Sequence, residues 1–581
     1  MNKPLKYSLI GIAGLLFLVI AGAAVFLLTF DANRYKPQIE RLVREKTGRT
    51  LKLQGPLEAA VWPSLGAKVS GVTFSERGSE QQFVALDNAH ASVALLPLLH
   101  GQVVVDKIRL SGFKATIVKQ KDGKFNFSDL LEAKAEKPAA KEEQPAKKDD
   151  GGAPVAFNVA GIDIDKSAIT YRDLSTGKEY SVSDFKLTTG RIAERADGKL
   201  QMHAAVKAPD LDVKMDLGAD YKLELPALTL DNLNLRLTGK EETNVRGRIA
   251  LAKVVAFDLN IDKLNVDAYM PVEQKPAASA STAEKPAAKP AADTPVDLSA
   301  LKDLNADGKL QIGALQVRGL KLASVKTEVK AANGELNAPH SANLYEGTLS
   351  GVLGAHADGR IALKDTLNGI AIGPLLRDAA QQDRLEGKGN LSLDVNAAGK
   401  SVNAMKKALA GTAKVDLKDG AIKGIDIGAI LQKARAALGQ QQAQAAASTE
   451  RTDFSSLTAS FNIKNGVAHN EDLDVKAPVF RVTGGGNIDI GSSSLDYTTK
   501  ASLVATTKGQ GGAAADQLSG LTVPVRLSGS FDNLKYDVNY GAVATELAKS
   551  KAGEKLKEKL EERLGAQGGS TADKLKGLLG R

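Results

Sequence analysis

Residues 228–237 have the sequence LTLDNLNLRL. Leucine and polar residues alternate here, which is the pattern of a β-strand with one apolar face. Successive leucines are two positions apart except once, where Leu230 is followed by Leu233 in a step of three. Such a step would turn every later side chain to the other face unless one extra residue is bulged out. The stretch therefore predicts a bulged strand with a continuous apolar face.

The same pattern recurs along much of the chain. Steps of three join alternating apolar residues at 105–108, 110–113, 261–264, 317–320 and 322–325. Because bulges and glycines bend sheets, we predict a mainly β fold: an elongated, curved, antiparallel-rich sheet of repeated short strands. The predicted apolar lining consists of Leu228, Leu230, Leu233, Leu235, Leu237, Leu259, Ile261, Leu264, Val266, Val317, Leu320 and Leu322.

A sheet that is apolar on one face must cover that face. Residues 50–367 show no pattern of an amphipathic helix that could do so. Three arrangements remain: two sheets face to face, a closed barrel, or a sheet curled into a trough whose lining contacts a hydrophobic ligand. The residue pattern does not choose among them.

An uncharged stretch, YSLIGIAGLLFLVIAGAAVFLLTF, occupies residues 7–30. At about 1.5 Å per residue it is long enough to cross a hydrocarbon core of about 30 Å. A cleaved signal peptide is the alternative, but the apolar run continues well past the small residues Ala21-Gly22-Ala23 and is longer than the apolar region of a signal peptide, which has about 7 to 15 residues. Lys3 and Lys6 lie before the stretch. We therefore predict a cytoplasmic N-terminus (1–6), a retained transmembrane helix and a remainder outside the cytoplasm.

Two stretches rich in Ala, Pro, Lys and Glu, residues 132–152 and 273–295, interrupt the strand pattern. They have little to bury, so we predict disordered linkers. They separate the regions 31–131, 153–272 and 296–541. In the last third, helices are predicted at 374–382, 401–409 and 427–447, and the tail 542–581 is predicted to be an amphipathic helix that lies on a membrane or closes the end of the sheet.

The composition offers little for catalysis. There is no cysteine, and the six histidines are scattered singly without metal-ligand spacing. Gly399-Lys400-Ser401 ends like a phosphate-binding loop but lacks the upstream glycine. The net charge of +9 comes from 77 basic and 68 acidic residues mixed throughout, which is typical of a solvated surface. We predict no enzymatic activity, no cofactor, no metal site and no nucleic-acid partner.

The segment after the uncharged stretch resembles the start of AsmA-family envelope proteins. The residues that match in order are Asp31, Tyr35, Lys36, Pro37, Ile39, Thr47, Gly48, Arg49, Gly55, Trp62 and Pro63. Residues 387–401, 409–431, 452–497 and 523–539 are similar to the C-terminal region of that family. The resemblance thus covers both ends of the chain, and the middle is similar in its strand rhythm.

The resemblance implies a function. AsmA-like proteins resemble TamB and chorein-type, bridge-like lipid-transfer proteins, in which a taco-shaped sheet forms a hydrophobic groove. It implies a single-pass protein of the bacterial inner membrane, with the bulk of the chain in the periplasm, that serves outer-membrane biogenesis. Phospholipid would lie in the groove and move between inner and outer membranes, with the tail near the outer membrane and envelope assembly proteins as partners. The alternative is a non-enzymatic scaffold of stacked β-sandwiches that assists outer-membrane protein assembly.

Overall fold

The computed structural model describes residues 31–60, 64–99, 103–132, 158–269, 293–424, 451–478, 480–503, 522–531, 533–539 and 541. In this part of the chain the fold is mainly β, as predicted. The chain divides into two compact units, Met1–Glu273 and Gln274–Arg581, called unit 1 and unit 2 below.

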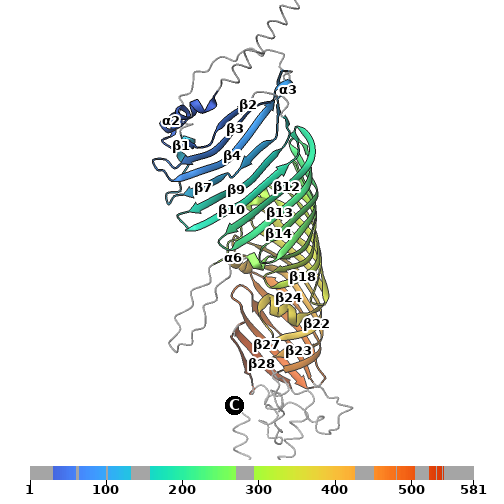
Figure 1. Ribbon diagram of the computed structural model, residues 1–581. Helices are drawn as coiled ribbons and strands as arrows, with labels where there is room; N and C mark the ends of the chain where they lie inside the picture. Colours follow the sequence, from blue (N-terminus) through green and yellow to red (C-terminus); the bar gives the residue numbers. More distant parts are fainter. Residues whose placement is uncertain are drawn as a thin grey trace, which may run out of the picture. The chain divides into compact units, whose positions relative to one another are not determined.

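The strands of unit 1 follow one another as a meander with one parallel junction (Figure 1). Strand β4 is followed in the sheet by β5, β6 and β7, which run parallel to β8 and β9. From β9 to β16 the neighbours are antiparallel, with the short β11 pairing with β8. The predicted regions 31–131 and 153–272 therefore share one sheet.

The strands of unit 1 are β1 (Leu51–Leu53), β2 (Leu57–Ala60), β3 (Ser64–Ser75), β4 (Gln82–Ala94), β5 (Val104–Val105), β6 (Ile108–Ser111), β7 (Lys114–Lys119), β8 (Asn158–Val159), β9 (Ile162–Asp173), β10 (Lys178–Thr189), β11 (Ile192–Ala193), β12 (Arg195–Ala208), β13 (Leu211–Glu224), β14 (Ala227–Thr238), β15 (Glu242–Leu251) and β16 (Val255–Asn265). Its helices are η1 (Ala32–Tyr35), α2 (Lys36–Thr47), α3 (Leu95–Leu99), α4 (Ser128–Glu132) and η2 (Asp267–Tyr269). The strands from β12 to β16 are 10 to 14 residues long, so the prediction of short strands is wrong for them, whereas β5, β6, β8 and β11 have 2 to 4 residues. A bulge lets one strand continue through a step of three.

Bulges occur at two of the predicted steps of three. The register of β14 shifts between Leu230 and Leu233, where Asn232 has a φ of 49°. In β18 the register shifts beside Ser324, whose φ is 51°. In β16, Ile261 and Leu264 are half-buried while the two residues between them are exposed, which is the same step of three.

At three other steps the structure differs from a bulge. At 105–108 and 110–113 the interruption is larger and divides the strand into β5, β6 and β7. At 317–320 the bulge prediction was wrong, because Arg318 (φ 50°) and Gly319 (φ 80°) form a two-residue hairpin turn with Val317 opposite Leu320. Such a turn places residues i and i+3 on one face, as a bulge does, so the spacing alone cannot distinguish the two.

Unit 2 is an antiparallel meander in which each strand from β17 to β29 pairs with the next. Its strands are β17 (Ala306–Val317), β18 (Leu320–Ala332), β19 (Glu335–Leu344), β20 (Gly347–His356), β21 (Arg360–Ala371), β22 (Leu385–Ala398), β23 (Ala410–Lys423), β24 (Arg451–Lys464), β25 (Val467–Lys476), β26 (Phe480–Asp489), β27 (Ser494–Leu503), β28 (Thr522–Ser530) and β29 (Asn533–Val538). Its helices are η3 (Ser299–Lys302), α5 (Ile372–Ala380) and α6 (Val402–Lys407).

Two helix predictions in unit 2 are confirmed, because α5 and α6 lie at 374–382 and 401–409 within the usual uncertainty of helix ends. The predicted helix at 427–447, the tail 542–581 and the uncharged stretch 7–30 lie outside the described residues. Among the residues that are described, no helix combines the length and the apolar character needed to cross a membrane.

The prediction of a disordered linker at 273–295 was wrong for its last three residues, 293–295. The Asp293 carboxylate accepts hydrogen bonds from the Ser401 hydroxyl and, at 3.0 Å, from the backbone N–H of Asn403. Pro295 also forms a β-bridge with Ser401. These bonds attach residues 293–295 to the start of α6, so the segment is ordered from Asp293 onward. An isolated acidic residue in a Pro-rich stretch gave no sequence signal for this contact.

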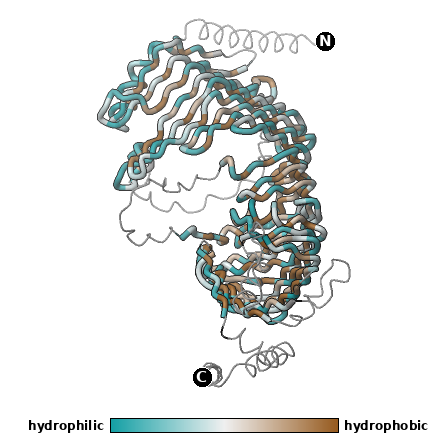
Figure 2. Tube along the Cα trace, turned by 90° about the horizontal axis from the view of Figure 1, so that it is seen from below, coloured by the Kyte–Doolittle hydropathy of each residue, from teal (hydrophilic) through white to brown (hydrophobic). Residues whose placement is uncertain are grey.

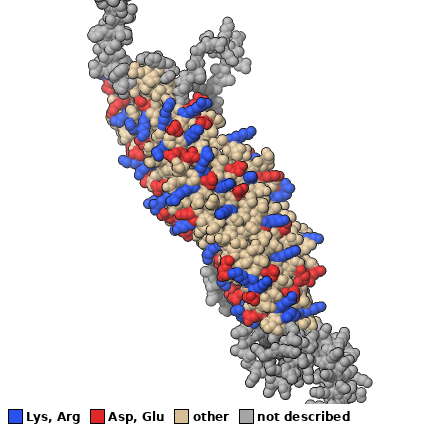
Figure 3. Space-filling view, turned by 90° about the vertical axis from the view of Figure 1, so that its right-hand side faces the viewer, with Lys and Arg blue, Asp and Glu red and all other residues tan. Residues whose placement is uncertain are grey.

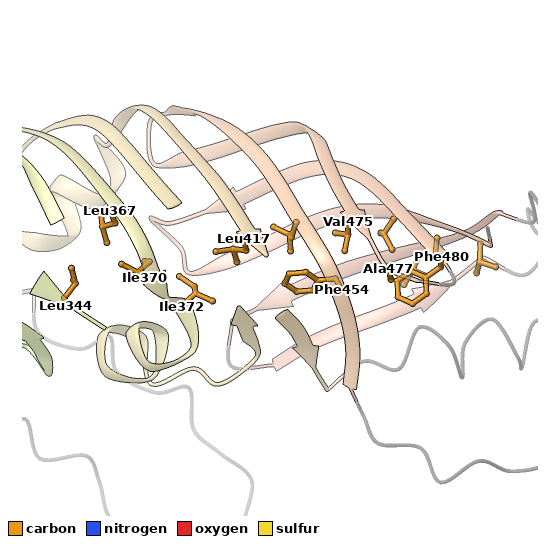
Figure 4. Close-up of a cluster of buried hydrophobic side chains, with 14 residues drawn as sticks. Leu344, Leu367, Ile370, Ile372, Leu417, Phe454, Val475, Ala477 and Phe480 are labelled. Carbon is orange, nitrogen blue, oxygen red and sulfur yellow. The ribbon is translucent and has the colours of Figure 1, made fainter. Parts of the chain in front are cut away.

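The strands of unit 2 curl around a cluster of buried apolar side chains, with Leu417, Phe454 and Phe480 pointing into the enclosed space (Figure 4). Leu417 and Val475 are each 1% exposed. Helix α5 contributes Ile372 to the same cluster. This part of unit 2 therefore has a buried apolar core.

Candidate functional site

A row of apolar side chains runs without interruption across the sheet of unit 1. Each member lies directly opposite the next on the neighbouring strand, from β2 to β16. The members, called the apolar row below, are Leu57, Val69, Ala89, Leu110, Ile164, Leu187, Met202, Leu217, Leu235, Val245 and Ile261. With about 4.8 Å between adjacent strands, a row of this kind extends roughly 48 Å.

Every member of the apolar row is half-buried. This differs from the cluster in unit 2, where Leu417 and Val475 are closed off from solvent. Among the described residues of unit 1, α2 packs at β1 and α3 packs at β3 and β4, whereas no α-helix makes more than marginal contact with β9 to β16. Among the described residues, no helix therefore covers the part of the apolar row on β9 to β16, and the side chains of the row stay partly accessible.

Further apolar residues widen this surface on both sides of the row. Leu237 lies opposite Met215, and Leu230 lies opposite Tyr221 and Ile249. Leu228 lies opposite Leu251. Figure 2 shows the resulting alternation of apolar and polar residues along the strands. The accessible surface is thus several residues wide along β13 to β15.

The predicted lining residues take the following places. Leu235 and Ile261 belong to the apolar row itself. Leu233 is buried, and the others are half-buried on the same face of β14 and β16 or, for Val266, just after β16: Leu228, Leu230, Leu237, Leu259, Leu264 and Val266. Val317, Leu320 and Leu322 are half-buried on β17 and β18 of unit 2. Their role in lipid binding stays a prediction.

Sequence reasoning missed most of the apolar row. The period of two identified apolar positions within single strands, including Leu57, Val69 and Leu110. It could not show that these residues line up with Met202 or Leu235, because that alignment depends on the cross-strand register. The parallel pairing of β6 with β9 had no local signal at all, since its partners are separated by the long stretch 112–161.

The opposite face of the same strands is polar. His203, Asp216, Arg236 and Asn244 form a row one residue away from the apolar row. His203 Nδ1 lies 2.6 Å from Asp216 Oδ1, and Arg236 donates to Glu242 at 2.8 Å. The bond from Arg236 lowers the pKa of the Glu242 carboxyl. Basic and acidic side chains intermingle over the face drawn in Figure 3, which suits contact with water.

One polar pair lies on the apolar face of unit 2. His340 on β19 and Asp365 on β21 flank Gly351 on β20, and His340 Nε2 is 3.1 Å from Asp365 Oδ1. A Cβ at Gly351 would clash with the Asp365 carboxylate, so glycine is required between the two. Asp365 is 9% exposed, and burial raises its pKa while His340 partly opposes that rise.

The described residues contain no group of three or more His, Asp or Glu placed to hold a metal ion. The hollows among them lie beside polar residues. One near the β3–β4 and β6–β9 pairings is lined by Lys68, Asn88, His90, Arg109 and Asp163, among others. In the described part of unit 1, the apolar row is a continuous surface of one chemical kind that crosses the sheet from β2 to β16.

Comparisons with known proteins agree with the resemblance of the two chain ends. The model of the AsmA family matches residues 1–255 and 252–473. The chain is 22% identical over 616 residues to Protein AsmA of Escherichia coli (strain K12), covering 97% of this chain and 98% of that protein. No solved structure matches the chain.

Proposed function

The chain belongs to the AsmA family, and on this premise we propose that it binds phospholipid along the apolar row and moves it between the inner and outer membranes. The family relationship supports a role in the cell envelope and outer-membrane biogenesis. We further propose that residues 7–30 anchor the chain in the inner membrane and that the units lie in the periplasm.

The observation that carries this proposal is the continuity of the half-buried apolar row across β2 to β16. A methylene group gains about 0.8 kcal/mol when it is removed from water. An acyl chain can therefore leave a bilayer at low cost where its methylenes stay covered at every step. A surface without polar interruptions over roughly 48 Å meets that condition.

The two faces of the sheet differ in the part of a phospholipid that each can contact. Acyl chains contact Leu217, Leu235 and their neighbours, while the charged headgroup stays in water at the margin of the apolar surface. The opposite face, with Asp216 and Arg236, remains hydrated. This activity needs no catalytic residue, so we propose a non-enzymatic transfer protein without cofactor.

The scaffold alternative has one observation in its favour, the closed core of unit 2 around Leu417 and Phe454. A scaffold of stacked β-sandwiches would bury its apolar faces between sheets, so the accessible apolar row of unit 1 argues against it. The two functions differ in whether lipid remains on the protein after purification.

The test is mass spectrometry of lipids that co-purify with residues 31–581. We expect phospholipid in the wild type and its loss in Leu217→Asp, with retention in the matched opposite-face variant Asp216→Leu. Absence of lipid from the folded wild type would support the scaffold.

A further inference from the structure

We propose that α2 lies on the membrane surface beside the anchor, with Ile39 and Leu42 inserted among the lipids. This inference rests on the proposed anchoring of residues 7–30. It concerns a second lipid contact of the chain, separate from the apolar row.

The first step is the way in which α2 is attached to the sheet. Its polar side chains make the attachment: Lys36 Nζ donates to the Gly55 carbonyl at 2.6 Å, and a Glu40 carboxylate oxygen accepts from the Leu53 backbone N–H at 2.7 Å. Lys36, Glu40 and Thr47 are half-buried on this side, together with one apolar residue, Val43. A helix on a soluble domain ordinarily places its apolar stripe there.

The second step is the stripe that this attachment leaves outside. Ile39 is 38% exposed and Leu42 is 56% exposed. Ile39, Leu42 and Lys46 follow the spacing i, i+3 and i+7, so they share one side of α2, and Tyr35 precedes α2 as its N-cap residue. All four are exposed. The stripe is therefore apolar for most of its length and ends in a basic residue.

The third step identifies the occupant. The uncharged stretch ends at Phe30, and α2 begins at Lys36. Six residues span at most about 20 Å, so an anchored chain must hold α2 close to the bilayer. An apolar stripe with Lys46 at its end suits the acyl and phosphate layers of an interface, where lysine keeps its charge near the headgroups.

The fourth step is the selection of a control position. Arg44 is exposed and lies about half a helical turn away from the stripe. Its positive charge lies near the Glu80 carboxylate, which accepts a hydrogen bond from Lys52 of β1. A probe at Arg44 therefore reports on the side of α2 that faces water in this arrangement.

The experiment uses single cysteines, because the chain contains none. The full chain carrying a nitroxide at I39C, L42C, R44C or L16C is reconstituted in vesicles of phosphatidylethanolamine and phosphatidylglycerol. Collisions with oxygen report on the bilayer, and collisions with a water-soluble nickel complex report on water. We expect labels at 39, 42 and 16 to meet oxygen preferentially and the label at 44 to meet nickel preferentially.

Three outcomes would overturn the inference. If the label at 16 lies in the bilayer while those at 39 and 42 match the label at 44, the anchor stands and the surface position of α2 is wrong. If the labels at 39 and 42 are shielded from both reagents, a protein covers the stripe instead of lipid. If the label at 16 is in water, the proposed anchoring fails and this inference fails with it. Ile39→Ser with Leu42→Ser should leave the thermal unfolding temperature unchanged, because both side chains are exposed.

Discussion

The guanidinium of Arg49 forms two parallel hydrogen bonds to the carboxylate of Asp129, with Nε to Oδ2 at 2.9 Å and Nη2 to Oδ1 at 2.5 Å. Arg49 is 1% exposed and also donates to the carbonyls of Ser75 and Asn126. Its guanidinium lies 5.1 Å from the ring centroid of Phe83. The bond from Arg49 lowers the pKa of the Asp129 carboxyl. Arg49, part of the segment that resembles the family, thus joins the end of α2 to α4.

We expect Arg49→Met to destabilise unit 1 by about 3 to 5 kcal/mol, because it leaves a partly buried carboxylate without its partner. The matched control is Arg236→Ala, which removes an exposed ion pair with Glu242 and should cost no more than about 1 kcal/mol. Urea unfolding of both variants measures the difference. Equal stability of the two variants would show that the buried pair contributes nothing.

A second prediction concerns the bulge that keeps Leu233 and Leu235 on the apolar face. Asn232 has a φ of 49°, and its side-chain amide donates to Asp220 at 2.7 Å. Asn232→Val should cost about 1 to 3 kcal/mol, because a β-branched residue is strained at positive φ. Asn234→Val, an exposed position on the same strand with ordinary backbone, is the control. Identical unfolding midpoints for the two variants would contradict the role of the bulge.

A third prediction follows from the raised pKa of Asp365. As the pH rises from below 3.8, the unfolded carboxyl loses its proton first, so the folded state loses stability through the window up to the raised value. Asp365→Asn removes this titration. We expect the free energy of unfolding of the wild type, relative to that of Asp365→Asn, to fall as the pH rises through 3.8 and above it.

The control for this prediction is Asp307→Asn on β17, where the side chain is exposed. Because that side chain is exposed, this substitution should change the free energy of unfolding by no more than about 0.5 kcal/mol. If the difference in free energy of unfolding between wild type and Asp365→Asn does not change with pH, burial of the carboxyl does not shift its titration.

The sequence predicted the mainly β fold, because period-two alternation is a local property of each strand. It also predicted a bulge between Leu230 and Leu233, because the change of phase there must be absorbed within one strand. It could not predict that β6 pairs in parallel with β9, or that Leu110 and Ile164 are therefore neighbours. Pairing depends on long-range register, which a single strand does not contain.

The central claim is that phospholipid lies on the apolar row, and site-specific photo-crosslinking in growing cells tests it most directly. Leu235 belongs to the row, and Arg236 is the next residue on the same strand with its side chain on the opposite, exposed face. A benzophenone amino acid at Leu235, Leu217 or Val245 should capture phospholipid, while one at Arg236, Asp216 or Asn244 should not. Equal capture from both faces, or no capture from either by a folded protein, would contradict the account.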